Sequence, residues 1–190
     1  MRLVLIVAAL LATSPVLENP HVRAYRITDG ALAGVTHGPG VVIAISEAPG
    51  IKAGTAVWAD DAALPSKLGN KHGVIVIVEP LRARQAAPGT GSKPGEAPFT
   101  GMSFKPIFEN DRVSVIRARM EVGAKEDFHT HGSDTIVVHL SGGEIEDTAD
   151  GKTVVNRWKP GDVEFESLGS SHSARNVGAA VDVVLVSLKP

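Results

Sequence analysis

Three histidines in the second half of the chain could hold one metal ion. His129 and His131 stand two residues apart in GAKEDFHTH, and His172 lies in a later segment, PGDVEFESLGSSHSARN. Side chains at i and i+2 of an extended strand project to the same face, whereas a helix would bring i and i+4 together. Imidazole suits several divalent metals and leaves open positions when three of them bind. The spacing predicts a strand-borne site for iron, manganese, nickel or zinc.

The residues around these histidines follow two spaced motifs. The matching positions are Gly123, His129, His131, Gly142, Gly161, Gly169, His172 and Asn176. This stretch resembles the cupin family, whose first motif is Gly, five residues, His-x-His, three or four residues, Glu, six residues and Gly. The second is Gly, five residues, Pro-x-Gly, two residues, His, three residues and Asn. Thr135 stands at the Glu position and Ser167 at the Pro position. The resemblance implies a jelly-roll β-barrel with a three-histidine metal site.

The resemblance also implies a class of chemistry. A threonine hydroxyl is a poor metal ligand, so three neutral imidazoles would hold a more positive ion with an extra open position. Such an ion favours an anionic or chelating small molecule, and cupin dioxygenases with three histidines on iron use this arrangement. We therefore predict a metal-dependent, dioxygenase-like enzyme. A non-catalytic exported binding or sensing protein and a metal-dependent isomerase or lyase are the alternatives.

Two further side chains near the motif are candidate catalytic residues. Strand alternation places Thr135, Val137 and His139 on the same face as His131. Thr135 would occupy the position of the missing carboxylate. His139 could orient a ligand or carry a proton, because its pKa lies near neutrality, or it could be a core histidine hydrogen-bonded to the backbone.

Other charged residues near the motif are expected to lie outside the site. Arg117 and Arg119 share one face of their strand, where they could bind a substrate carboxylate or line a solvated surface. Strand parity directs Asp134 out of the barrel. Glu126 and Asp127 precede the first histidine and are expected at the barrel mouth, where they could tune access to the site or, as we favour, be surface charges.

Composition excludes several functional classes. The net charge of −2 and the absence of Lys or Arg runs disfavour nucleic acid and membrane surfaces as partners. The chain has no cysteine, so disulfides and thiolate ligands are excluded. Aromatic residues make up only 4% of the chain, so the pocket for a small-molecule ligand is expected to be lined by Val, Ile, Phe128 and Phe165, without a large stacking platform.

Residues 1–14 have the order of a secretory signal peptide. Arg2 precedes an apolar run from Leu3 to Ala12, which is followed by small residues. The run is too short for a permanent membrane span. We predict export to the periplasm or medium with no integral span after cleavage. A core strand or anchoring helix, with a cytoplasmic protein, is the alternative.

A faint internal repeat divides the chain into two halves. Glu18, Asn19, Val22 and Arg26 match Glu109, Asn110, Val113 and Arg117, and Thr36-His37-Gly38 then matches Thr130-His131-Gly132 after a length change. The alignment equates Val41 with Thr135 and leaves the first half only His37 of the ligand set, and a single imidazole cannot hold a divalent metal specifically. We therefore expect His37 and His72 to be surface loop histidines beside glycine. We predict a degenerate cupin-like half over 15–81, a linker or loop over 82–101 and a metal-binding cupin domain over 102–190.

Short β-branched runs between turn signals predict the all-β class. The expected strands are Val41 to Ile45, Gly73 to Val78, Val113 to Met120, Asp134 to Leu140, Thr153 to Trp158, Asp162 to Phe165 and Val181 to Leu188. Asp150-Gly151 is a hairpin signal. The expected architecture is two tandem cupin-like halves. The first half would act as a structural or dimerising domain or a lid, and barrels of this kind often pair through their sheets, so a homodimer is expected.

Overall fold

The computed structural model describes residues 14–28, 38–48, 51–60, 73–82 and 99–190, and these form strands without a helix. The all-β class is therefore confirmed. None of the described residues forms an apolar helix of membrane-spanning length. Residues 1–13, which carry the predicted signal peptide, lie outside the described residues, as do His37 and His72, so export remains a prediction.

The described residues of the N-terminal half form one five-stranded antiparallel sheet with the order β1-β2-β5-β3-β4. Its strands are β1 (Leu17–Glu18), β2 (Val22–Ile27), β3 (Gly40–Ala44), β4 (Ala56–Ala59) and β5 (Ile75–Pro80). The central strands β3 and β5 are buried along their whole length. Their β-branched runs suit strands that are covered on both faces.

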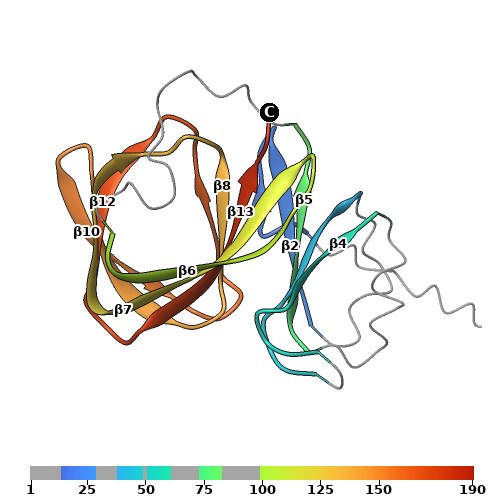
Figure 1. The fold of residues 1–190 in the computed structure, drawn as a ribbon, viewed down its shortest axis with the longest axis horizontal. Coiled ribbons are helices and arrows are strands. Elements are labelled where there is room, and N and C mark those ends of the chain that lie inside the picture. Colours follow the sequence, from blue (N-terminus) through green and yellow to red (C-terminus); the bar gives the residue numbers. More distant parts are fainter. Residues whose placement is uncertain (1–13, 29–37, 49–50, 61–72, 83–98) are drawn as a thin grey trace, which may run out of the picture.

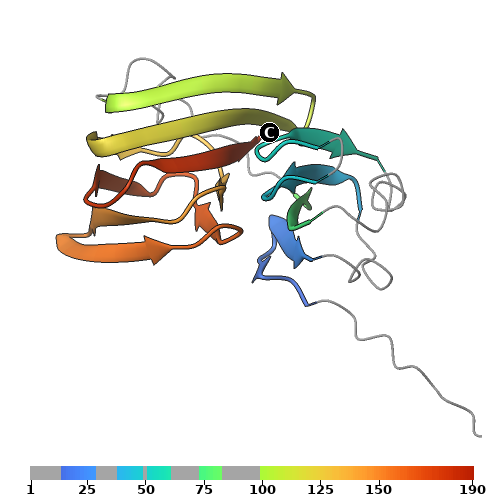
Figure 2. The same ribbon diagram turned by 90° about the horizontal axis from the view of Figure 1, so that it is seen from below.

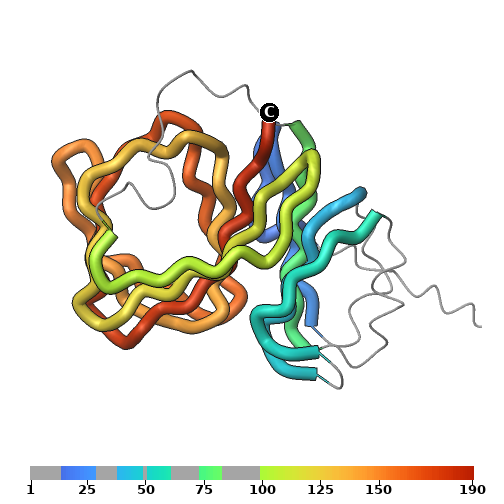
Figure 3. Tube along the Cα trace, in the orientation of Figure 1, coloured from blue at the N-terminus to red at the C-terminus, as the bar shows by residue number. Residues whose placement is uncertain are grey.

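The C-terminal half is an eight-stranded antiparallel sheet that curls into a barrel (Figures 1 and 3). Its strands are β6 (Phe99–Glu109), β7 (Val113–Thr130), β8 (Thr135–His139), β9 (Gly143–Ala149), β10 (Lys152–Trp158), β11 (Val163–Glu166), β12 (Ser171–Asn176) and β13 (Val181–Leu188). Asp150 and Gly151 both have positive φ in the β9–β10 hairpin, as their sequence predicts. Strand β7 pairs with β13 over its first part and with β12 over its last part, so it belongs to both walls.

Strand β6 was not expected from the sequence. It begins at Phe99, inside the predicted 82–101 linker, of which residues 83–98 lie outside the described residues. Gly101 has positive φ, and the pairing with β7 shifts register beside it and again after Pro106. In the described residues β6 pairs with β7 alone, and an edge strand tolerates glycine and proline that a central strand would not.

The two sheets share one strand order. In the N-terminal sheet the neighbouring strands are, in order, β1, β2, β5, β3 and β4. The corresponding neighbours in the barrel are β6, β7, β13, β8 and β11. Matching rows of paired residues are Leu17, Ala24, Val78, Val41 and Trp58 in one sheet and Phe108, Val115, Val186, Ile136 and Phe165 in the other. This correspondence supports the internal repeat. It equates Val41 with Ile136, so the predicted match of Val41 to Thr135 is displaced by one residue.

These matching rows lie in one hydrophobic core between the halves. Buried residues of the N-terminal sheet, such as Ile43 and Val76, share a cluster with Val115, Ile136 and Val184 of the barrel. Figure 2 shows the N-terminal sheet beside the barrel wall. The N-terminal half therefore covers the outer face of this wall, and a homodimer that paired through the same face would have to displace it.

Equivalent asparagines form the turns that precede β2 and β7. The Oδ1 atom of Asn19 accepts hydrogen bonds from the backbone N–H groups of His21 and Val22, at 2.8 and 3.0 Å. The Oδ1 atom of Asn110 accepts the corresponding bonds from Arg112 and Val113, at 2.8 and 2.9 Å. Such turns favour asparagine because its short side chain reaches the backbone two residues ahead.

Asn110→Ala is expected to lower the free energy of unfolding by about 1–3 kcal/mol, because two backbone donors lose their acceptor. Urea denaturation followed by circular dichroism measures the loss. Asn110→Asp keeps an acceptor oxygen and is expected to retain most of the stability. Equal losses in both variants would contradict a role for the side-chain acceptor.

Candidate metal centre

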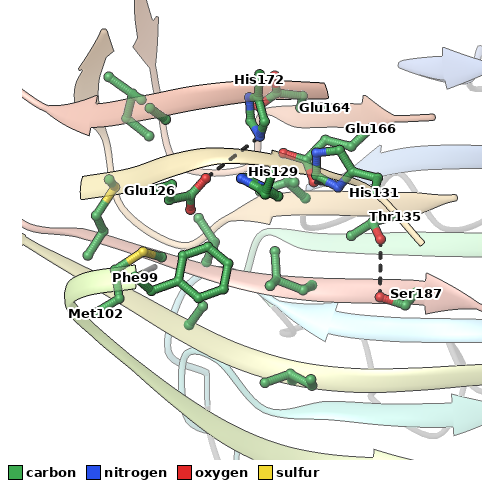
Figure 4. A pocket seen from close by; sticks show the side chains of 18 of the residues that line it. Phe99, Met102, Glu126, His129, His131, Thr135, Glu164, Glu166, His172 and Ser187 are labelled. Atoms are coloured by element: carbon green, nitrogen blue, oxygen red, sulfur yellow. Dashed lines mark hydrogen bonds and ion pairs between the residues drawn. The ribbon is translucent and has the colours of Figure 1, made fainter. Parts of the chain in front are cut away.

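The three predicted histidines converge inside the barrel (Figure 4). His129 lies near the end of β7, and His131 is the first residue after that strand. His172 of β12 is the cross-strand partner of His129. Each offers one ring nitrogen, and these nitrogens lie within 4.8 Å of one another. The ring centroids are 4.7 to 4.9 Å apart. The i and i+2 spacing thus brings two ligands to one face, and antiparallel pairing supplies the third.

Two of the imidazoles are oriented through their Nδ1 atoms. His129 Nδ1 donates to the backbone carbonyl of Asp127 at 3.0 Å, and His172 Nδ1 donates to the carboxylate of Asp147 at 2.8 Å. Partners of this kind fix the ring tautomer and leave Nε2 free for a metal. The Nε2 atom of His172 is buried without a hydrogen-bond partner in the described residues. A buried polar atom of this kind needs a ligand, so the donor set fits a divalent cation.

His131 is held in its neutral form. Burial lowers its pKa to about 4, and the neighbouring His172 and His129 add to the shift. Its Nδ1 lies 3.5 Å from an oxygen of Glu166, whose own pKa is raised well above the usual value, chiefly by burial. Metal ligation requires a neutral imidazole, so His131 needs no deprotonation at pH 7 before it binds an ion.

The histidines open into a cavity of about 530 Å³, large enough for a small organic molecule. Its lining includes Phe99, Phe104 and Trp158, which the low aromatic content did not predict. Phe128 and Phe165 are not part of the lining. Phe128 is 70% exposed, and Phe165 packs in the core between the halves, because on β11 its parity is opposite to that of the inward residues.

Four carboxylates also line the cavity, and the described lining contains no Lys or Arg. They are Glu126, Asp147, Glu164 and Glu166. The Glu126 side chain is 19% exposed and lines the cavity, so its expected position as a surface charge is wrong. Its burial raises the pKa of this carboxyl. The sequence VEFE of β11 could have indicated that Glu164 and Glu166 lie together, because alternation along a strand puts them on one face.

Thr135 and His139 both line the cavity. The Thr135 hydroxyl lies 3.1 Å from the Ser187 hydroxyl, with which it hydrogen-bonds. His139 is 1% exposed and stacks on Trp158 with ring centroids 4.5 Å apart. Neither of its nitrogens has a hydrogen-bond partner in the described residues, so it is not a core histidine satisfied by the backbone. Their catalytic roles remain predictions.

The remaining charged candidates lie outside the cavity lining. Arg117 forms an ion pair with Asp182 and Arg119 forms one with Glu121. Asp134 is buried, and its Oδ1 accepts a hydrogen bond from the backbone of Leu168 at 2.8 Å. Asp134 therefore braces the loop before β12, in agreement with its exclusion from the ligand set.

Asp147→Asn is expected to weaken metal binding by about 10- to 100-fold, because His172 loses the carboxylate that orients it. Isothermal titration of zinc chloride into metal-free protein measures the affinity. Asp127→Asn is the matched control, since Asp127 contacts His129 through its backbone carbonyl. An equal loss in the control would contradict the orienting role of the Asp147 carboxylate.

No family model and no curated protein matches this chain. Among solved structures, it is similar to a cupin domain from Bordetella pertussis Tohama I, with 22% identity and a TM-score of 0.44 over 47% of this chain and 95% of that one. It is also similar to an RmlC-like cupin from Shewanella frigidimarina NCIMB 400, with 16% identity and a TM-score of 0.40 over 56% and 96%. The antiparallel sheet that curls into a barrel and the placement of the motif histidines inside it confirm that the C-terminal half has the cupin fold.

Proposed function

We propose that the barrel binds one divalent metal ion and acts with it on a small chelating molecule in the cavity. The convergence of His129, His131 and His172 on one point of the cavity carries the proposal. The bound ion would supply Lewis acidity and, with iron or manganese, redox chemistry at its open positions. Our leading function is a dioxygenase-like oxidoreductase.

The cavity lining restricts the proposed substrate. Phe99, Met102 and Val137 provide apolar surface beside the imidazoles, which suits the carbon skeleton of a small molecule. Asp147 and Glu164 add negative charge, and the described lining offers no cation to balance it. We therefore favour a chelating substrate whose donor atoms bind the metal over one recognised by its negative charge alone.

Oxygen consumption tests whether the protein is a dioxygenase-like enzyme. Iron-loaded protein is mixed with small diketones, hydroxyketones and catechols, and dissolved oxygen is followed with an electrode. We expect uptake with at least one compound class and none with His172→Ala. Protein that binds iron and one of these compounds, but consumes no oxygen and leaves the compound unchanged, would overturn the enzyme proposal in favour of a binding module.

A further inference from the structure

We infer that Glu126 supplies the metal site with the carboxylate that Thr135 does not provide. The inference rests on the proposed metal site and concerns its ligand set. Thr135 of β8 occupies the motif position of the carboxylate, yet its hydroxyl is hydrogen-bonded to Ser187 (Figure 4). A carboxylate ligand would have to come from another strand.

Glu126 of β7 is placed beside the nitrogen that the metal would use. Its Oε2 lies 3.7 Å from His172 Nε2, as the dashed line in Figure 4 shows. The other nitrogen of His172 is bound to Asp147, so Nε2 is the one left for a cation. Ligand atoms about 2.1 Å from one ion lie at most about 4.2 Å apart, and the observed separation falls within that limit.

A bulge in the β7–β12 pairing turns Glu126 inward. Glu126 pairs with Ala174 and His129 pairs with His172, so two residues of β7 stand opposite Ser173 alone. Residues three apart on a regular strand face opposite sides. The extra residue in β7 brings both side chains to the cavity, and such bulges commonly re-aim side chains next to functional sites.

The other cavity glutamates have different partners. Glu166 faces Thr135 across the β8–β11 pair, but its nearest imidazole atom is Nδ1 of His131. The backbone carbonyl of Asp127 and the carboxylate of Asp147 contact the same ring nitrogen, Nδ1, of the other two histidines, so Glu166 lies on the Nδ1 side of His131. Glu164 lies 3.9 Å from His139, which is not one of the three ligands.

The geometry also requires a movement of Glu126. The three histidine nitrogens form a group within 4.8 Å of one another, and Glu126 is not part of that group. Its carboxylate contacts His172 alone among them. Rotation about the side-chain bonds between staggered conformations would bring the carboxylate toward a cation held by all three.

Calorimetric titration of manganese chloride into the metal-free full-length protein tests the inference. Glu126→Gln is expected to weaken binding by at least about 10-fold, since a direct ligand should count for no less than an orienting partner. Glu164→Gln, which changes a cavity carboxylate whose histidine neighbour is His139 and not one of the three ligands, is expected to bind like the wild type. Circular dichroism confirms folding, and Glu126→Asp replaces Glu126→Gln if that variant does not fold.

The outcomes separate this inference from the proposed function. Wild-type protein that binds no manganese, iron or zinc would overturn the metal site and the inference with it. Wild-type affinity in folded Glu126→Gln would overturn the inference alone. A larger loss in Glu166→Gln than in Glu126→Gln would also overturn it, because Glu166 would then be the carboxylate ligand.

Discussion

Replacing His172 with alanine is expected to abolish stoichiometric metal binding. His172 is the proposed ligand from β12, and its buried Nε2 has no hydrogen-bond partner in the described residues. His129 and His131 alone would leave two imidazoles on neighbouring positions of the chain, which cannot enclose an ion from opposite sides. Since loss of an orienting partner already costs about 10- to 100-fold in affinity, loss of a ligand should cost at least as much.

Metal analysis by mass spectrometry of protein purified without chelator measures this effect. Wild-type protein is expected to carry up to one equivalent of metal, and His172→Ala is expected to carry none. His21→Ala is the matched control, because His21 lies in the N-terminal half and hydrogen-bonds to the backbone of Arg82. Metal retained in His172→Ala, or lost equally in the control, would contradict the assignment of the site.

The ligand histidines could be predicted because their arrangement depends on local spacing. A two-residue period brings His129 and His131 to one face, and the motif spacing places His172. The position of Glu126 could not be predicted in this way. It depends on the bulge between β7 and β12, which changes the facing of every residue beyond it. Phe128, which was expected in the pocket, instead faces outward because it is adjacent to His129 and successive side chains of a strand face opposite sides.

Predicting the residues of the pocket wall would have required knowing which strands distant in sequence come together. Trp158 of β10 stacks on His139 of β8, although the two strands are not hydrogen-bonded neighbours. Periodicity indicates which side chains of one strand share a face, but it does not indicate which of the two faces is enclosed. For β11 the enclosed face carries Glu164 and Glu166, and the face with Phe165 packs against the N-terminal half.

The repeat was partly visible in the sequence because the two halves share a turn residue. Asn19 and Asn110 keep the same hydrogen bonds to the following strand. The barrel strands β9, β10 and β12 have no counterpart among the described N-terminal residues. The segment between β4 and β5, which would correspond to β12, falls on residues 61–72 outside the described part of the chain. Because the described N-terminal sheet shares its core with the barrel, we expect this half to have a structural role.

An aspartate at Ile43 is expected to destabilise both halves together. Ile43 is fully buried in the core that the N-terminal sheet shares with the barrel wall. An unpaired carboxylate there should lower the free energy of unfolding by at least about 3 kcal/mol. Because the two sheets bury one continuous core, the barrel should lose stability as well as the sheet that carries the substitution.

The chain's two tryptophans report on the two halves separately. Trp58 lies in β4 of the N-terminal sheet and Trp158 in β10 of the barrel. Urea unfolding is followed by fluorescence in Trp58→Phe and Trp158→Phe backgrounds, each with and without Ile43→Asp. We expect both signals to shift to lower urea by the same amount, whereas Val57→Asp, on the more exposed face of β4, should shift neither appreciably. A shift of the Trp58 signal alone would mean that the barrel is stable without its N-terminal cover, and the structural role of this half would then be excluded.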